Sequence, residues 1–467
     1  MTTLSLRLAQ HVAGVRFGDL PPGAVEMAKR SLLDAIGVSL GASGLGEGVQ
    51  PFIDLALESG GRGEATILGV GAKAPTLMAA LANGALAHAL DFEDAHDVAL
   101  VHPNAQIIPA LLAIAEARAP VSGRDLLTAL AVGCDLVCRL KLAGARDPAD
   151  LGWYPPALLG AVGAAAASAR LLGGDAEQIV DALSLVLGPG AASAEVKYSP
   201  RSHVRAVRDG FAAHAGLLAA RLAVAGVRGF DQPIEGKAGL YALYAGGGFD
   251  EAALVDGLGR RFEGEFVSYK AFPACRGTHA FIEMALDMRA GRSIAADDVR
   301  EMVMTGGPIQ QMLTEPREQR LAPKTAIDAK FSTPFTTALT FVRGAPTLAD
   351  FLPGRLADPA ILALARRSRF ELEPDNGRPI SWGRLQITLS DGTMLSGAVD
   401  DAIGHPSKPP SWTQLTDKFR QCAAYAQKPL PPDALDDAIA AIRTLDQHDD
   451  AAAAIFGTAQ LALETLT

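Results

Sequence analysis

The stretch between Asn83 and Pro103 gathers side chains that exchange protons near neutral pH. Imidazole beside carboxylate is the pairing that proteins use to hold an acid or a base near neutrality. The stretch contains three of the nine histidines of the chain and four acidic residues, which are His88, His96, His102, Asp91, Glu93, Asp94 and Asp97. This composition predicts a site of proton transfer.

Two apolar segments with helical periodicity flank this stretch, one after Pro75 and one after Pro103. The acidic and imidazole groups are therefore expected on the connection between two buried helices, where a rigid scaffold orients them. The alternative to a role in proton transfer is a structural one, because Asp91 or Asn104 could cap a helix.

The three histidines receive different interpretations. We favour a chemical role for His102 and for the neighbouring Asp91, whereas His88 is interpreted as a core histidine whose ring nitrogens have hydrogen-bond partners. His96 is left between two alternatives, lining the site or facing solvent.

Composition narrows the class of protein. A chain of 467 residues with 49% apolar content predicts a globular protein of two or three domains. Its N-terminus lacks a basic region followed by a long apolar segment, and its apolar runs end before the roughly 18 residues that a membrane span needs. We therefore expect a cytoplasmic protein that has no membrane partner.

Charge and cysteine usage exclude further classes. A net charge of −10 argues against a nucleic-acid partner, which requires a concentrated basic face. The four cysteines are too few and too scattered for a disulfide framework or a metal cluster, although Cys134 and Cys138 are one helical turn apart. The sequence predicts buried thiols, no metal and no cofactor.

Basic residues nevertheless cluster locally, beside turn residues and apolar helices. Such clusters are either solvated faces or sites that bind a carboxylate. They comprise Arg205 with Arg208, then Lys270 with Arg276 and His279, and finally Lys324 with Lys330.

The periodicity of the chain divides it into two domains. Residues 1–266 and 405–467 have helical patterns, whereas residues 267–404 include segments with period two at 384–389 and 395–399, joined across Asp391-Gly392, and a weaker strand at 299–305. We predict a mostly α fold, in which a large, discontinuous all-helical domain receives an inserted, smaller α+β lid domain. A cleft between such domains is the expected place for a site.

Four blocks of this sequence resemble the MmgE/PrpD superfamily, which includes 2-methylcitrate dehydratase, cis-aconitate decarboxylase and iminodisuccinate epimerase. Their order and spacing match over nearly the full chain. The blocks are Asn83-Gly-x4-His88-x2-Asp91-Phe-x-Asp94 with His102-Pro103, Gly210-x-Ala-Ala-x2-Gly216 with Gly226, Lys270-x-Phe-Pro273-x-Cys275-x3-His279, and Ala329-Lys330-Phe331-Ser332. The resemblance implies a helical domain with an α+β lid, usually in a homodimer, and a small di- or tricarboxylate as substrate.

The resemblance also implies roles for single residues. Asp91 and His102 match the first catalytic block and His279 the third, with His102 moving the proton. Asp91 would orient an imidazole or hold a substrate hydroxyl. The residues expected to bind substrate carboxylates are Lys270, Arg276, Lys330 and Ser332, with His96 and Arg208 as further candidates; a domain-bridging ion pair is the alternative for Lys330.

Two positions depart from the family pattern. Tyr154 follows Gly152-Trp153 where the family usually has histidine, and Arg205 stands where it usually has lysine. A guanidinium beside a phenol stabilises the phenolate, so Tyr154 and Arg205 could form an acid or base pair across the site from His102. Alternatively, both bind carboxylate and His102 acts alone.

We predict a metal-independent lyase of the 2-methylcitrate dehydratase type. It would abstract a proton next to a carboxylate and eliminate water. An epimerase of the iminodisuccinate kind and a decarboxylase of the cis-aconitate kind are the alternatives, and a non-catalytic protein that binds polycarboxylates is a further one.

Overall fold

The chain forms two compact units in its computed structural model. The structure describes residues 2–190, 192–199, 202–292, 294–374 and 377–464, and side chains up to residue 458. The first unit, here the helical unit, consists of Met1–Ala89, Val101–Val267 and Ser411–Thr467; the second, here the mixed unit, consists of Leu90–Leu100 and Ser268–Pro410. The sequence-based division assigns residues 90–100 to the helical domain, whereas in the structure they belong to the mixed unit.

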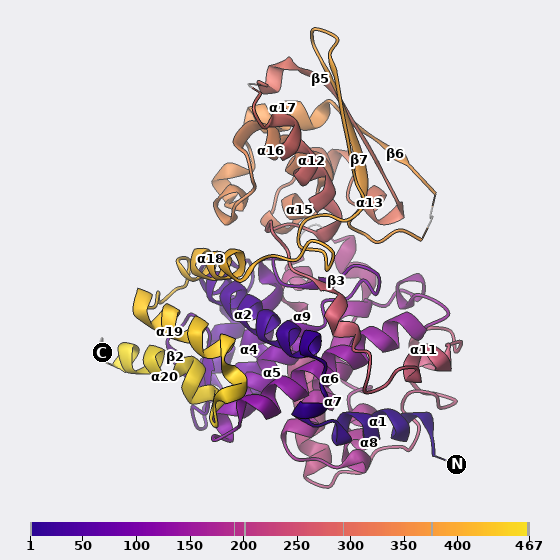
Figure 1. Cartoon of the computed structure of the whole chain (residues 1–467), viewed down its shortest axis with the longest axis vertical. Helices are drawn as coiled ribbons and strands as arrows, with labels where there is room; N and C mark the ends of the chain where they lie inside the picture. The colour runs from indigo at the N-terminus through magenta and orange to yellow at the C-terminus, as the bar shows by residue number, and fades with distance from the viewer. Residues whose placement is uncertain (1, 191, 200–201, 293, 375–376, 465–467) are drawn as a thin grey trace. The chain divides into compact units, whose positions relative to one another are not determined.

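The helical unit begins with three helices, α1 (Leu4–Gly14), α2 (Pro22–Leu45) and α3 (Gln50–Glu58). The short strands β1 (Ala65–Ile67) and β2 (Ala72–Ala74) follow them. The other helices are α4 (Thr76–Ala89), α5 (Asn104–Ala117), α6 (Gly123–Ala143), α7 (Pro155–Leu171), α8 (Ala176–Leu185), α9 (Val204–Val224), α10 (Leu240–Tyr244), α11 (Glu251–Val255), α18 (Trp412–Ala423), α19 (Pro432–Arg443) and α20 (Ala451–Glu464) (Figure 1). In the described part of the chain, no helix combines the length and the apolar character needed to cross a membrane.

Small residues let α4, α7 and α9 pack closely at the centre of the helical unit. A Cβ added to Gly216 of α9 would lie 2.6 Å from Ala164 Cβ in α7, and one added to Gly210 would lie 2.5 Å from the carbonyl oxygen of Leu81 in α4. Both distances are shorter than atoms can approach, so these positions require glycine. Glycine at these two positions therefore allows the close approach of α9 to α7 and α4.

The hairpin of β1 and β2 was not expected, because residues 1–266 were predicted to be helical. The two strands pair antiparallel, and both Gly69 and Gly71 in the turn adopt positive φ. Asn83 of α4 holds the hairpin, since its Oδ1 accepts from Leu68 N at 2.9 Å and its Nδ2 donates to Thr66 O at 2.8 Å. Three-residue strands are too short for periodicity to reveal.

The mixed unit is built on a four-stranded sheet with the order β6-β5-β7-β8. Its elements are β3 (Ala95–His96), β4 (Val267–Ser268, at the boundary), α12 (His279–Arg289), β5 (Val299–Gly306), α13 (Pro308–Met312), α14 (Arg317–Leu321), α15 (Ala326–Lys330), α16 (Thr333–Arg343), α17 (Pro359–Arg366), β6 (Ser368–Leu372), β7 (Gly383–Leu389) and β8 (Met394–Val399). Phe281 of α12, Phe335 of α16 and Ile387 of β7 are fully buried in the core beneath the sheet.

The predicted strands are confirmed. β7 pairs antiparallel with β8 around Asp391-Gly392, where Gly392 has φ 89°, and β5 pairs antiparallel with β7. The edge strand β6 pairs parallel with β5 and was missed, because its mostly half-buried or exposed residues lack a buried apolar face. With this small sheet and predominantly helical content, the mostly α fold class is confirmed.

Candidate functional site

In the helical unit, His88 and His102 lie at the facing ends of two helices. His88 is in the last turn of α4, and His102 lies two residues before α5. Their ring centroids are 5.1 Å apart at an interplanar angle of 65°. His88 is fully buried, and its Nδ1 lies 3.6 Å from Oδ2 of the equally buried Asp209 in α9. This pairing agrees with a supporting role for His88, while the half-buried His102 remains the candidate for proton transfer.

Tyr154 lies at the start of α7, in a cavity of about 300 Å³ within the helical unit. The backbone N–H of Tyr154 donates to Ala192 O at 2.9 Å, which fixes this position. The guanidinium of Arg208 stacks over its ring at 4.5 Å, and Arg208 also lines the cavity. Arg205 was predicted to pair with Tyr154 and Arg208 to bind substrate. Because Arg208 is one turn along α9 from Arg205, both arginines lie on the same face of the helix.

The surroundings of this cavity are cationic. Lys197 Nζ lies 5.6 Å from the centre of the Tyr154 ring. Burial lowers the pKa of the Lys197 ammonium, and repulsion from Arg205 and Arg208 lowers it further, although Asp147 and Asp150 act in the opposite direction. An anion bound here would relieve that repulsion, so these residues favour a carboxylate ligand.

In the mixed unit, Lys270 pairs with Asp91. The Lys270 ammonium donates to Asp91 Oδ1 at 2.8 Å and to the Asp91 carbonyl at 2.9 Å, and both side chains are buried. Burial, the largest influence, acts to lower the pKa of Lys270, but the charges of Asp91 and Glu93 outweigh it and raise this pKa above its usual value. The lysine predicted to bind substrate therefore holds an acidic residue of the protein.

Arg276 and His279 form a second buried group in the mixed unit. Arg276 Nε donates to both oxygens of Asp97 at 3.0 and 3.1 Å, and its terminal nitrogens donate to the carbonyls of Ile403 and Ala402 at 2.7 and 3.0 Å. Nη1 also lies 3.3 Å from His279 Nδ1. Since a guanidinium only donates, Nδ1 must accept, and the proton on Nε2 is then directed to the carbonyl of Ala274 at 3.2 Å.

The remaining predicted binding residues also have partners within the mixed unit. Lys330 Nζ donates to the Leu90 carbonyl at 2.5 Å. Ser332 caps α16, accepting from Phe335 N at 3.0 Å and donating to the Arg320 carbonyl at 2.5 Å. These contacts give both residues structural functions, and their binding of substrate stays a prediction.

His96 stabilises a turn. Its Nδ1 accepts from the backbone N–H of Ala99 at 3.0 Å and lies 3.3 Å from that of Val98. Only 3% of His96 is exposed, so the alternative in which it faces solvent is wrong. Its predicted binding of substrate is not tested by these contacts.

Sequence reasoning missed three residues that lie within these groups. Lys197 precedes α9 without any motif, Asp209 was not distinguished from ordinary helix acids, and Asp97 was noted only as part of an acidic stretch. A signal existed for Asp97, because it lies in the histidine-rich stretch. The other two become recognisable only when separate helices pack together.

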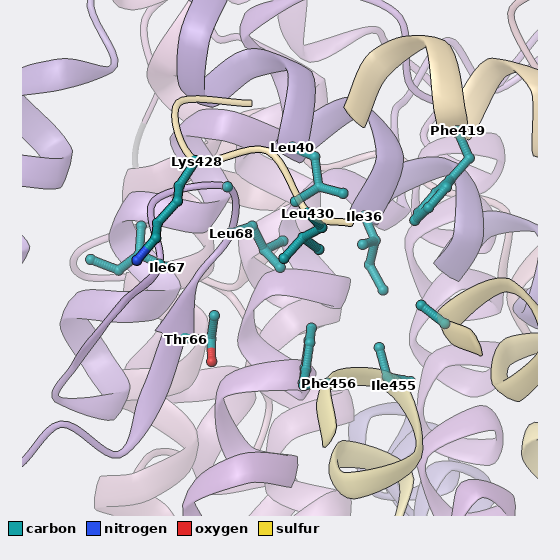
Figure 2. Close-up of a pocket in the computed structure, with 13 residues that line it drawn as sticks. Ile36, Leu40, Thr66, Ile67, Leu68, Phe419, Lys428, Leu430, Ile455 and Phe456 are labelled. Carbon is teal, nitrogen blue, oxygen red and sulfur yellow. The ribbon is translucent and has the colours of Figure 1, made fainter. Parts of the chain in front are cut away.

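A second cavity in the helical unit has an apolar character. It measures about 50 Å³ and lies among α2, the β1–β2 hairpin, α18, α19 and α20. Figure 2 shows Ile36, Phe419 and Phe456 around this space, with Lys428 as the charged residue among those that line it. It contains no predicted site residue and is too small for a tricarboxylate.

Comparison with known proteins adds two family matches and several relatives. A model of the MmgE/PrpD N-terminal domain matches residues 6–252, and a model of the MmgE/PrpD C-terminal domain matches residues 272–441. The chain is 28% identical to the cis-aconitate decarboxylase of Homo sapiens over 96% of this chain and 93% of that protein. It is 28% identical to the enzyme of that name from Mus musculus, over 94% and 90%, and 26% identical to one from Aspergillus terreus, over 87% and 86%.

Proposed function

Because the chain belongs to the MmgE/PrpD family, we propose that it is a lyase that removes carbon dioxide from a small unsaturated tricarboxylate of the cis-aconitate kind. The relatives named cis-aconitate decarboxylase support this alternative better than the dehydratase that we expected from the sequence. The binding of a polycarboxylate by this chain is part of the proposal.

The observation that carries the proposal is the cationic cavity around Tyr154. Arg208 lines it and stacks on the phenol ring, while Lys197 lies on the same ring and is repelled by Arg205. Arg208 also forms an ion pair of 3.6 Å with the buried Asp209, and a substrate with several carboxylates would add negative charge beside these cations. Charge-assisted hydrogen bonds from guanidinium to carboxylate are among the stronger polar contacts in proteins.

The chemistry requires an acid and stabilisation of negative charge. When the bond to the departing carboxylate breaks, its electron pair stays on carbon and delocalises into the neighbouring unsaturated acid, while carbon dioxide leaves. A proton must then be delivered to carbon. We assign that delivery to Tyr154 or His102, and the stabilisation of the anion to Arg205 and Arg208.

The test follows products in deuterated water. The purified protein is incubated with cis-aconitate, and carbon dioxide, deuterium in the product and the mass of the product are measured. We expect carbon dioxide release with incorporation of one deuterium. Loss of water from 2-methylcitrate would instead support the dehydratase, and deuterium exchange in an imino-dicarboxylate without loss of mass would support the epimerase; either outcome without decarboxylation would overturn the proposal.

A matched pair of variants tests the anion site. Arg208→Gln should raise KM for the substrate about 10- to 100-fold, because a hydrogen bond to a charged group is worth roughly 1.5–3 kcal/mol. Arg221→Gln removes an exposed arginine near the end of the same helix and should leave KM within about twofold. Equal effects of the two substitutions would contradict a specific role for Arg208.

We also propose a homodimer, which the family resemblance implies. Its support is the apolar surface of α9 and α3, where Phe211 and Leu55 are 54% and 51% exposed and Phe211 meets Phe52 edge to face at 5.3 Å. Sedimentation equilibrium should give twice the chain mass. Leu55→Lys should shift the equilibrium toward the monomer.

A further inference from the structure

Three cations of the mixed unit converge on one short piece of chain, residues 90–100. Lys330 donates to the carbonyl of Leu90, Lys270 donates to the carbonyl and the carboxylate of Asp91, and Arg276 donates to the carboxylate of Asp97. The cations come from separate parts of the sequence: the loop after β4, the turn before α12, and the end of α15. All three are at least 97% buried.

The segment is held in a conformation that a free peptide would avoid. Within the described residues, the non-glycine residues with positive φ are Asp91 at 48° and Leu100 at 55°, one near each end of the segment. A left-handed backbone costs roughly 1–2 kcal/mol for a residue with a side chain. It persists only where surrounding contacts fix it, and the contacts to Leu90, Asp91 and Asp97 supply that constraint.

Further contacts hold the segment to the same unit. The Ile380 N–H donates to the Asp97 carbonyl at 3.4 Å, and His96 Nδ1 accepts from the Ala99 N–H inside the segment. Every polar contact described here lies within the mixed unit, although the chain continues from α4 into the segment and from the segment into α5.

We propose that Lys270 is a positioning residue for Asp91, with Arg276 anchoring the other end of the segment, and that neither of these two cations binds the substrate. Lys270 donates to both the carboxylate and the backbone carbonyl of Asp91, so that Asp91 presents one orientation to the reaction. The proposal rests on the proposed function for its kinetic consequences. Its structural part stands without it.

The kinetic test compares Lys270→Met and Lys270→Arg with Lys408→Met, which removes an exposed lysine of the same unit. In Lys270→Met, kcat should fall about 100-fold or more while KM changes by less than about threefold, because the lysine acts through Asp91. Lys408→Met should change neither quantity.

If the Lys270→Met variant does not fold, Lys270→Arg still tests the proposal. The arginine keeps the positive charge and the hydrogen-bond donors, so part of kcat should be retained, with KM unchanged. A rise in KM of tenfold or more in either variant at unchanged kcat would identify Lys270 as a substrate ligand and overturn the proposal.

A second measurement needs no activity. Amide hydrogen exchange of residues 90–100 should accelerate at least tenfold in Lys270→Met, while exchange in α12 stays within about twofold. Unchanged protection of residues 90–100 would overturn the positioning role. If the native enzyme fails to turn over any candidate acid and exchange still responds as expected, the proposed function fails and the positioning of Asp91 by Lys270 stands.

Discussion

At the scale of single residues, the pair of Tyr154 and Arg208 decides how the helical unit can act on an acid. The phenol carries a dissociable proton, and the guanidinium that stacks on its ring has N–H groups that can donate to an anion in the same cavity. The sequence suggested Arg205 as the partner of Tyr154. The structure shows Arg208 over the ring, one turn further along α9, and the pairing of Arg205 with Tyr154 stays a prediction.

Tyr154→Phe tests the phenol as a proton donor. The substitution keeps the ring and its contact with Arg208 but removes the hydroxyl, so kcat should fall about 10²- to 10⁴-fold, the range for loss of a general acid. Tyr198→Phe is the control, because that tyrosine is 69% exposed and outside the cavity lining. A Tyr154→Phe enzyme with full turnover would assign proton delivery to another group.

His102→Ala tests the other proton carrier. Deuterium exchange into substrate or product should be lost while the unfolding temperature stays within a few degrees, because His102 is only half-buried. His203→Ala, an exposed histidine, serves as the control. If exchange continues in His102→Ala at the native rate, His102 is not the base.

At the scale of elements, the packing of α18 on α2 joins the C-terminal helices to the N-terminal part of the chain. Glycines of α2 lie against α18 and the turn after it: a Cβ at Gly37 would be 2.9 Å from Phe419, one at Gly41 2.9 Å from the Cys422 carbonyl oxygen, and one at Gly44 2.0 Å from the Tyr425 carbonyl oxygen. Lys418 Nζ adds an ion pair of 2.6 Å with the buried Asp34. The three glycines of α2 therefore determine how closely α18 and the turn after it approach α2.

Gly44→Ala should destabilise the chain. The new methyl group would collide with the carbonyl of Tyr425, which belongs to the backbone and cannot rotate away, and overpacking of this kind typically costs about 1–3 kcal/mol. Gly14→Ala, at the end of α1, has no atom within 4 Å of the added carbon and should be neutral or stabilise by up to about 1 kcal/mol. Urea unfolding measures both, and a stable Gly44→Ala variant would show that α18 moves freely on α2.

At the scale of the whole molecule, the stability of the fold depends on pH through the buried neighbours Asp135 and His11. Burial raises the pKa of Asp135 to about 6, against the opposing influence of Arg139. Burial also lowers the pKa of His11 to about 4, and Arg139 adds to that effect. The stability contributed by Asp135 is present below the pKa that this group has in the unfolded chain, and it is lost as pH rises through about 6. The stability contributed by His11 is present above pH 6.5 and is lost as pH falls through about 4. The two dependences oppose each other.

His11→Asn should separate them. Between pH 7 and pH 5, His11 costs the native chain roughly 2 kcal/mol of stability, because its imidazole binds a proton in the unfolded chain but not in the folded one. The variant should therefore lose about 2 kcal/mol less than the native chain over this interval in urea unfolding. His203→Asn, with an exposed imidazole, should follow the native curve. Parallel curves for His11→Asn and the native protein would contradict a buried neutral His11.

Local patterns in the sequence were sufficient for the family, the mostly α fold and the strands β5, β7 and β8. Helical periodicity, the Asp391-Gly392 turn and the spacing of the motif residues are properties of residues that are close in sequence, so they can be recognised without the tertiary structure. The strand β6 was not predicted because it lies at the sheet edge. The β1–β2 hairpin was not predicted because its strands are too short to show a period.

Tertiary structure alone decided what the charged residues contact. Lys270, Arg276 and Lys330 looked like carboxylate ligands in the sequence, yet each donates to the segment 90–100, which is separated from them by more than 160 residues. Arg208 stacks on Tyr154 because of how α7 and α9 pack. The partner of a buried charge is set by which distant parts of the chain fold against it, because burying an unpaired charge is costly.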